Sequence, residues 1–130
     1  MNMPGVLLVS VAVSWLAAPA AAQRECDDDW AQKYDGRQVN VCARMVGGVY
    51  LSRSHRQPTL LYLDRAFDKH IFSAVIYGQD RAKFGEPEKA FLGKMTCVKG
   101  VLTVSGDRAE IVVTEPGQLS LDKTCEASNC

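Results

Sequence analysis

The sequence lacks the motifs that mark most hydrolytic and nucleotide-dependent enzymes. It contains no Gly-x-Ser-x-Gly, no His-Glu-x-x-His and no glycine-rich phosphate loop. Cys-x-x-Cys spacing is also absent, which disfavours a zinc site. Only two histidines occur in the 130 residues, and we interpret His55 as a loop residue and His70 as the end of a turn. We therefore predict a protein that is not an enzyme and that needs no metal or cofactor.

The sequence also lacks net charge. Its formal charge is zero at pH 7, which argues against a strongly basic nucleic-acid-binding protein. The charges are unevenly distributed, however, because residues 37–108 hold 12 Lys or Arg against 6 Asp or Glu and the flanking residues carry the compensating acids. The central part of the chain is therefore basic by itself.

The first 22 residues contain no charged side chain. A mostly apolar run, Val6–Ala18, precedes four small residues at 19–22, a pattern typical of a secretory signal peptide that is cleaved before Gln23. A cationic amino-terminal region is missing apart from the α-amino group, so an uncleaved membrane anchor, which needs about 20 apolar residues, stays open. We expect an exported chain, periplasmic or secreted, with no stable membrane span after cleavage.

The strongest local pattern is a hairpin between Gly93 and Pro116. Two β-branched runs flank a Gly-Asp pair, which is a strong hairpin signal. Inward residues alternate along both arms, with Val98, Gly100, Leu102 and Val104 on the first and Ala109, Ile111 and Val113 on the second. Pro116 then closes the second strand.

Three further strands are predicted before this hairpin. The first covers about 37–46 and continues at 49–51 after a bend or bulge at Gly47-Gly48. The second covers about 59–63 and the third about 71–77. The residues of the first strand that face one way are Val39, Val41, Ala43 and Met45, and those that face the other are Asn40, Cys42 and Arg44.

Two short helices are predicted outside the strands. Asp27-Asp28-Asp29 precede a run that ends at Gly36, which is typical of an N-cap and a C-terminal stop, with calcium binding by the aspartates as the alternative. Pro87 opens a second helix that extends to Leu92. We expect three apolar residues around this helix, Phe84, Phe91 and Leu92, to close one end of a barrel.

The order of three strands, a helical connection and a hairpin, together with the opening Gly-Lys-x-x-Cys-Val-x-Gly at 93–100, resembles the OB-fold. The sequence is similar to small bacterial OB-fold domains of exported or nuclease-associated proteins, over about 36–119. The segments that carry the resemblance are 58–63, 71–80, 84–85, 93–94 and 109–113. It implies an all-β fold with a short helix, a five-stranded Greek-key barrel. The barrel would cover 37–118, after a signal peptide at 1–22 and a helical extension at 23–36, and before a cysteine-containing tail at 119–130.

All five cysteines, at 26, 42, 97, 125 and 130, lie beyond the proposed cleavage site, and an oxidising compartment favours their pairing. The first and fourth strands of an OB barrel are antiparallel neighbours, so the resemblance implies that Cys42 faces Cys97 across the ladder. Opposed residues lie about 5 Å apart, within the reach of a disulfide. Pairing of Cys26 with Cys125 or Cys130 stays open, as does a role of the cysteines as small buried apolar residues.

OB domains bind ligands over strands two and three, framed by the loops between strands one and two and between strands four and five. On this sequence the resemblance implies a ligand-binding face made of Arg53, His55, Arg56, Tyr62, Ser73, Tyr77 and Arg108. Cations beside aromatic rings suit single-stranded nucleic acid, because phosphates attract positive charge and bases stack on flat surfaces. The alternative is that these charges only solvate loops and the tyrosines only cover the barrel.

These patterns lead us to expect a non-catalytic binding module for single-stranded DNA or RNA. The main alternative is an envelope structural or interaction protein that binds a protein or glycan partner through the same face. A metal-dependent nuclease is a third hypothesis, since the acids Asp64, Asp68, Asp80 and Glu110 are ligand types for a metal, although their spacing matches no metal-nuclease pattern.

Overall fold

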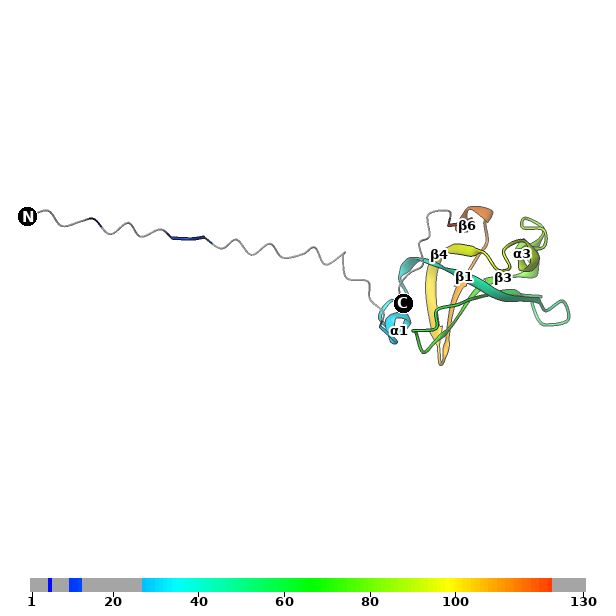
Figure 1. The fold of residues 1–130 in the computed structure, drawn as a ribbon. Helices are drawn as coiled ribbons and strands as arrows, with labels where there is room; N and C mark the ends of the chain where they lie inside the picture. Colours follow the sequence, from blue (N-terminus) through cyan, green and yellow to red (C-terminus); the bar gives the residue numbers. More distant parts are fainter. Residues whose placement is uncertain (1–4, 6–9, 13–26, 123–130) are drawn as a thin grey trace, which may run out of the picture.

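The computed structural model describes Gly5, residues 10–12 and residues 27–122, and the folded barrel lies within the last of these ranges (Figure 1). In chain order the elements are α1 (Trp30–Lys33), β1 (Gln38–Tyr50), β2 (Thr59–Leu63), β3 (Ile71–Ile76), α2 (Gly78–Arg81), α3 (Pro87–Ala90), β4 (Met95–Ser105), β5 (Arg108–Val112), the 3-10 turn η2 (Pro116–Gln118) and β6 (Leu119–Leu121). The predicted strands and both predicted helices are present, whereas α2, η2 and β6 are additional elements.

The strands form one sheet that closes on itself. Their order is β1-β2-β3-β5-β4-β6, and a further pairing of β1 with β4 completes a five-stranded barrel. The β3–β5 pair is parallel and the other pairs are antiparallel. This closed Greek-key order confirms the predicted all-β OB-fold barrel. The short strand β6 adds to the free side of β4 outside the barrel.

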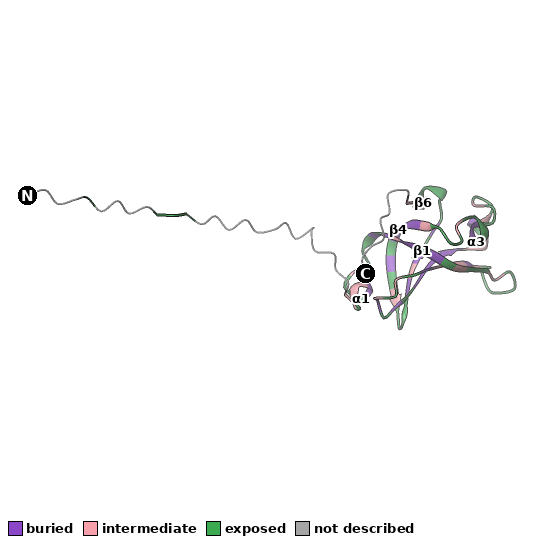
Figure 2. Cartoon of the chain, in the orientation of Figure 1, coloured by how far each residue is buried: buried purple, intermediate pink, exposed green. Residues whose placement is uncertain are grey.

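Alternate side chains of the strands fill the interior of the barrel. Figure 2 shows buried and exposed segments alternating along the strands. The predicted inward residues are buried, except for Val104, which is partly buried. With residues of β2 and β3 they form one core, whose strand residues are Val39, Val41, Ala43, Met45, Leu61, Leu63, Phe72, Ala74, Ile76, Val98, Leu102, Ala109, Ile111 and Val113. A period of two along the strands therefore predicted the buried side chains of the first strand and of the hairpin, whereas β3 is buried at five successive positions.

The predicted bend of the first strand is a β-bulge. The register of β1 against β2 shifts between Met45 and Gly47, which lets one long strand pair with β4 in its first half and with β2 in its second half. Gly48 lies where α3 crosses the strand. A Cβ atom at Gly48 would come within 2.9 Å of the Cβ atom of Glu88, so the absence of a side chain allows α3 to pack there.

The amino-terminal helix is capped differently from the prediction. Asp29 occupies the N-cap position, but its side chain makes no capping hydrogen bond. Instead the backbone N–H of Ala31 donates to Oδ2 of Asp68, from the loop between β2 and β3, at 3.1 Å. Oδ1 of the same buried carboxylate accepts the backbone N–H of His70 at 2.9 Å and lies 2.7 Å from Nδ1 of its ring. Asp68, whose carboxylate is held in place by His70, therefore attaches α1 to the barrel.

The expected closure of the barrel near α3 is confirmed for two residues and wrong for one. Phe84 and Phe91 are partly buried and pack against the core. Leu92, in contrast, is 52% exposed. The helix ends at Ala90, so the chain has left the helical path before Leu92 and its side chain no longer follows the buried side of α3.

The disulfide between Cys42 and Cys97 is present, as the resemblance implied. The two residues are direct partners in the β1–β4 ladder, with their Cα atoms 4.0 Å apart and a sequence separation of 55. A cross-link that closes a loop of this length restricts the unfolded chain and stabilises the fold by about 4 kcal/mol in the chain-entropy model. Cys26, Cys125 and Cys130 lie outside the described residues.

We predict that Gly100→Ala destabilises the barrel strongly. Gly100 is buried in β4 with a φ of +156°, and a Cβ atom there would come within 2.5 Å of Cγ2 of Ile111. Overpacking of this kind costs about 1–3 kcal/mol, measurable by urea unfolding of the oxidised protein. The control is Gly117→Ala, because a Cβ atom there would meet nothing within 4 Å. Equal stability of the two variants would contradict this account of the packing at Gly100.

Candidate nucleic-acid interface

The outer side of β2, β3 and β5 forms the surface on which the sequence analysis placed a ligand. The strand register puts Tyr62, Ser73 and Glu110 side by side in one row across the three strands. Leu60, Val75 and Val112 form the next row. We refer to these two rows together as the outer face. On this face Val112 is exposed, Leu60, Tyr62 and Glu110 are partly exposed, and Ser73 and Val75 on the central strand are buried.

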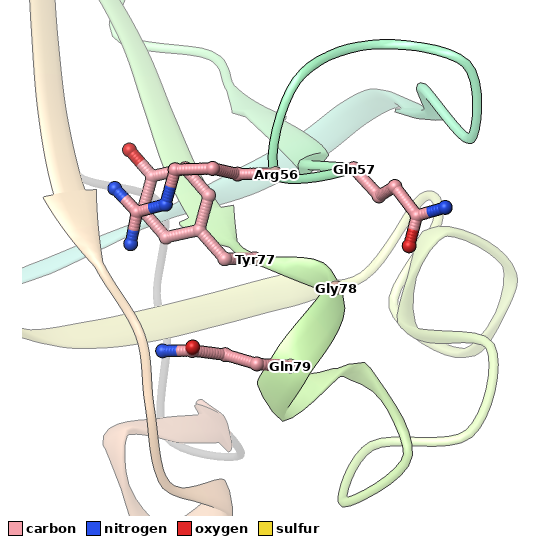
Figure 3. A pocket seen from close by; sticks show the side chains of 5 residues that line it. All are labelled: Arg56, Gln57, Tyr77, Gly78 and Gln79. Atoms are coloured by element: carbon pink, nitrogen blue, oxygen red, sulfur yellow. The ribbon is translucent and has the colours of Figure 1, made fainter.

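One end of the outer face carries a stacked pair of side chains, Arg56 and Tyr77. Arg56 lies in the loop between β1 and β2, and Tyr77 directly follows β3. The Cζ atom of the Arg56 guanidinium lies 3.7 Å from the centre of the Tyr77 ring (Figure 3). At this distance the cation and the ring are in van der Waals contact, so the tyrosine orients the arginine.

The backbone holds the β1–β2 loop in an uncommon conformation at this point. Arg56 and Gln57 are the non-glycine residues with positive φ among those described, at 62° and 46°. Side chains disfavour this region, and residues held in it cluster at functional sites. Two hydrogen bonds hold the loop in this conformation. The backbone N–H of Gly78 donates to the carbonyl of Arg56 at 2.9 Å, and the side-chain amide of Gln57 donates to the carbonyl of Ser52 at 3.1 Å.

A shallow hollow lies beside this pair. Its lining residues are Arg56, Gln57, Tyr77, Gly78 and Gln79. Gly78 allows the loop to approach closely, because a Cβ atom there would come within 2.9 Å of the Gln57 side-chain oxygen and 3.3 Å of the Arg56 carbonyl. Arg56 and Tyr77 were predicted from the sequence as ligand-binding residues. Gln57, Gly78 and Gln79 were not, because only the folded loop brings them together at this end of the outer face.

The predicted site residues do not all converge. Arg53, His55 and Arg56 are exposed in the β1–β2 loop, and Tyr62 and Tyr77 are partly exposed. Ser73 occupies an outward register position but is only 7% exposed, because it lies on a central strand between larger neighbours. Arg108 pairs with Ile71 at the opposite end of β3 from Tyr77. The six residues of β3 span roughly 20 Å, so Arg108 is separated from Arg56 by about that distance.

Two arginines of the basic central region are engaged within the protein. Arg81 donates to both carboxylate oxygens of Glu88, at 3.0 and 2.7 Å, and to the Thr59 hydroxyl at 2.7 Å, and it stacks over Tyr50. Arg65 is half-buried among three aromatic rings, those of Trp30, Phe67 and Phe72, and this burial lowers its pKa. These two cations hold the structure together and contribute little to binding at the surface.

Three other arginines remain available on the surface. Arg53, Arg56 and Arg108 are exposed and form no ion pair with any described residue. All three were predicted as ligand-binding residues. Glu110 lies between them in the middle of the outer face and would repel a phosphate group, so the face is not uniformly favourable to nucleic acid.

The four acids considered as metal ligands do not gather at one point. Within the described part of the chain, three potential ligand groups come together at Cys42, Cys97 and Asp122. The two sulfur atoms there are bonded to each other, so they are not thiolate ligands for a metal. No helix among the described residues is both long and apolar enough to cross a membrane.

Comparisons with known proteins add little to this geometry. No protein-family model matches the chain, and no curated protein matches its sequence. Among solved structures, one similar chain is the asparaginyl-tRNA synthetase from Pyrococcus horikoshii, at 18% identity and a TM-score of 0.49. The match covers 68% of this chain but only 20% of the synthetase chain. The assignment to the OB-fold class rests on the strand order and the closure of the barrel.

We predict that the Arg81–Glu88 pair makes stability sensitive to acid. The hydrogen bonds from Arg81 lower the pKa of the Glu88 carboxyl in the folded protein. A lowered folded pKa contributes stability that is complete above the unfolded pKa, about 4.3, and is lost as the pH falls through the folded pKa. Glu88→Gln should therefore be less stable at pH 7 and lose less stability between pH 6 and pH 3 than the parent.

The measurement is urea unfolding at several pH values over this range. The control is Glu86→Gln, because Glu86 makes an exposed pair with Lys89 at 3.3 Å, which contributes little. The control should lose stability with acid as the parent does. If Glu88→Gln lost as much stability between pH 6 and pH 3 as the parent does, the Arg81–Glu88 pair would not account for the pH dependence.

Proposed function

We propose that this protein is an exported, non-catalytic module that binds single-stranded DNA or RNA. The observation that carries the proposal is the Arg56–Tyr77 stack at the end of the outer face of an OB barrel, with Arg56 exposed and without an ion-pair partner among the described residues. A flat cation attracts phosphate and stacks with unpaired bases at the same time. A duplex hides the faces of its bases, so this arrangement favours single strands.

The distribution of free cations defines the path of the strand. Arg53 and Arg56 lie at one end of the outer face and Arg108 at the other, with Tyr62 between them. A track of roughly 20 Å suits the lower part of the range of about 4–16 nucleotides that OB domains cover. Because Glu110 opposes phosphates at the middle of the track, we expect modest affinity.

A second candidate function is binding of a protein partner through the same region. Two exposed apolar side chains on β3 and β5 favour it, since Ile71 is 52% exposed and Val112 is 41% exposed. Exposed apolar residues of this kind occur at protein interaction sites. Binding of a protein would depend weakly on salt, whereas binding of nucleic acid depends on it strongly.

Export is supported by the signal-like pattern of residues 1–22 and by the Cys42–Cys97 disulfide, which suits an oxidising compartment. We predict that protein recovered from the periplasm or the medium begins at Gln23, because cleavage is expected after the small residues at 19–22. Amino-terminal sequencing checks this. Recovery of the intact chain in the membrane fraction would instead support an uncleaved anchor.

The binding prediction is tested by fluorescence anisotropy of the oxidised chain with a labelled single-stranded oligonucleotide, at several salt concentrations. We expect the affinity to fall with salt. In Arg53→Ala/Arg56→Ala/Arg108→Ala the slope of log K against log salt should lose about 2 units, since each phosphate contact to a single strand contributes about 0.7. Glu110→Gln should bind more tightly than the parent, because it removes a repulsive charge.

A second triple variant, Lys89→Ala/Lys94→Ala/Lys99→Ala, is the control. It removes the same charge from exposed residues outside the outer face. It should retain most of the binding. No binding by the parent at low salt, or equal losses in the two triple variants, would contradict the proposed function. Incubation with and without a chelator should leave the oligonucleotide intact in both cases, and chelator-sensitive cleavage would indicate a nuclease.

A further inference from the structure

The hollow beside Arg56 has features that go beyond a general attraction for phosphate. Tyr77 covers one face of the Arg56 guanidinium, while Arg56 as a residue remains exposed. A planar group that is already stacked on one side offers its other side to a second planar group. The base of an unpaired nucleotide is the planar group that this protein would meet in its proposed function.

The hollow is organised before any ligand arrives. The positive φ values of Arg56 and Gln57 and the hydrogen bond from Gly78 N–H to the Arg56 carbonyl hold the loop against the end of β3. The stack on Tyr77 then restricts the arginine side chain itself. Little conformational entropy is lost when a partner binds to groups that are already ordered.

A free amide lies at the same site. The side chain of Gln79 extends to the same side of the loop as those of Arg56 and Tyr77, whereas that of Gln57 points away (Figure 3). The Gln57 side-chain amide donates a hydrogen bond to the Ser52 carbonyl. Gln79 is exposed, and its side-chain amide has no hydrogen-bond partner among the described residues. Its donor and its acceptor are therefore both available.

The chemistry of this amide selects among the bases. A glutamine side chain pairs with adenine through two hydrogen bonds, because it donates to N7 and accepts from N6. We propose that the hollow is a subsite for one unpaired adenine, which stacks on the exposed face of Arg56 and is read by the amide of Gln79. This inference rests on the proposed function and adds to it a base preference and the residue that determines it.

The test compares labelled dA12, dT12 and dC12 by fluorescence anisotropy with the oxidised full chain and three variants. The parent should bind dA12 about fivefold to tenfold more tightly than dC12, at the lower end of what one good bidentate contact contributes. Gln79→Met keeps the length of the side chain but removes the amide, so the preference for dA12 should disappear while the dependence on salt stays unchanged.

Arg56→Lys separates stacking from charge. It keeps the cation but loses the plane, so the affinity for dA12 should fall about fivefold or more, as expected for the loss of one stacking contact, with little change in the salt slope. Arg53→Lys is the matched control in the same loop and should behave like the parent, since Arg53 is not part of the stack. Urea unfolding of each variant checks that the barrel is intact.

The outcomes distinguish this inference from the function on which it rests. Salt-dependent binding with equal affinities for dA12, dT12 and dC12 would overturn the adenine subsite and leave the proposed function standing. A preference for dA12 that survives in Gln79→Met would overturn the role of Gln79. No binding of any oligonucleotide at low salt would overturn both.

Discussion

The closure of β1 against β4 is the constraint on which the rest of the structure depends. One long strand pairs with β4 in its first half and with β2 in its second half, and the bulge between Met45 and Gly47 makes the change of partner possible. The disulfide between Cys42 and Cys97 lies on this ladder and joins segments that are 55 residues apart. Without this closure the five strands would leave open edges and an exposed core.

The same closure determines where binding groups can lie. The barrel buries the inward half of each strand, so only the loops and the outward residues remain for a ligand. The loop between β1 and β2 reaches the end of β3, where its backbone adopts positive φ at Arg56 and Gln57 and Arg56 stacks on Tyr77. Unfavourable backbone conformations persist when the surrounding structure holds them, and here the hydrogen bond from Gly78 to the Arg56 carbonyl does so.

The basic character of the central region has two different physical roles. Arg65 and Arg81 are stacked on aromatic rings, and Arg81 also pairs with Glu88, so their charges stabilise the contacts of α1 and α3 with the barrel. Arg53 and Arg108 remain exposed, at opposite ends of the outer face. A count of charges in the sequence does not distinguish these four arginines. Burial and contacts with neighbouring side chains, which only the structure shows, separate an arginine that stabilises the fold from one that can bind a ligand.

The sequence by itself determined the class of fold, the alternation that fills the core, the bend at Gly47-Gly48 and, with the resemblance to OB-folds, the disulfide partners. The alternation and the bend depend on local periodicity and turn chemistry, which neighbouring residues encode, whereas the fold class and the disulfide partners followed from the order of the elements and the resemblance. Only the tertiary structure decided that Asp68 caps α1, that Ser73 is covered and that Gln79 lies beside Arg56. Each of these facts joins residues that are distant in sequence or sets a side chain among neighbours from other strands, and no local pattern records such contacts.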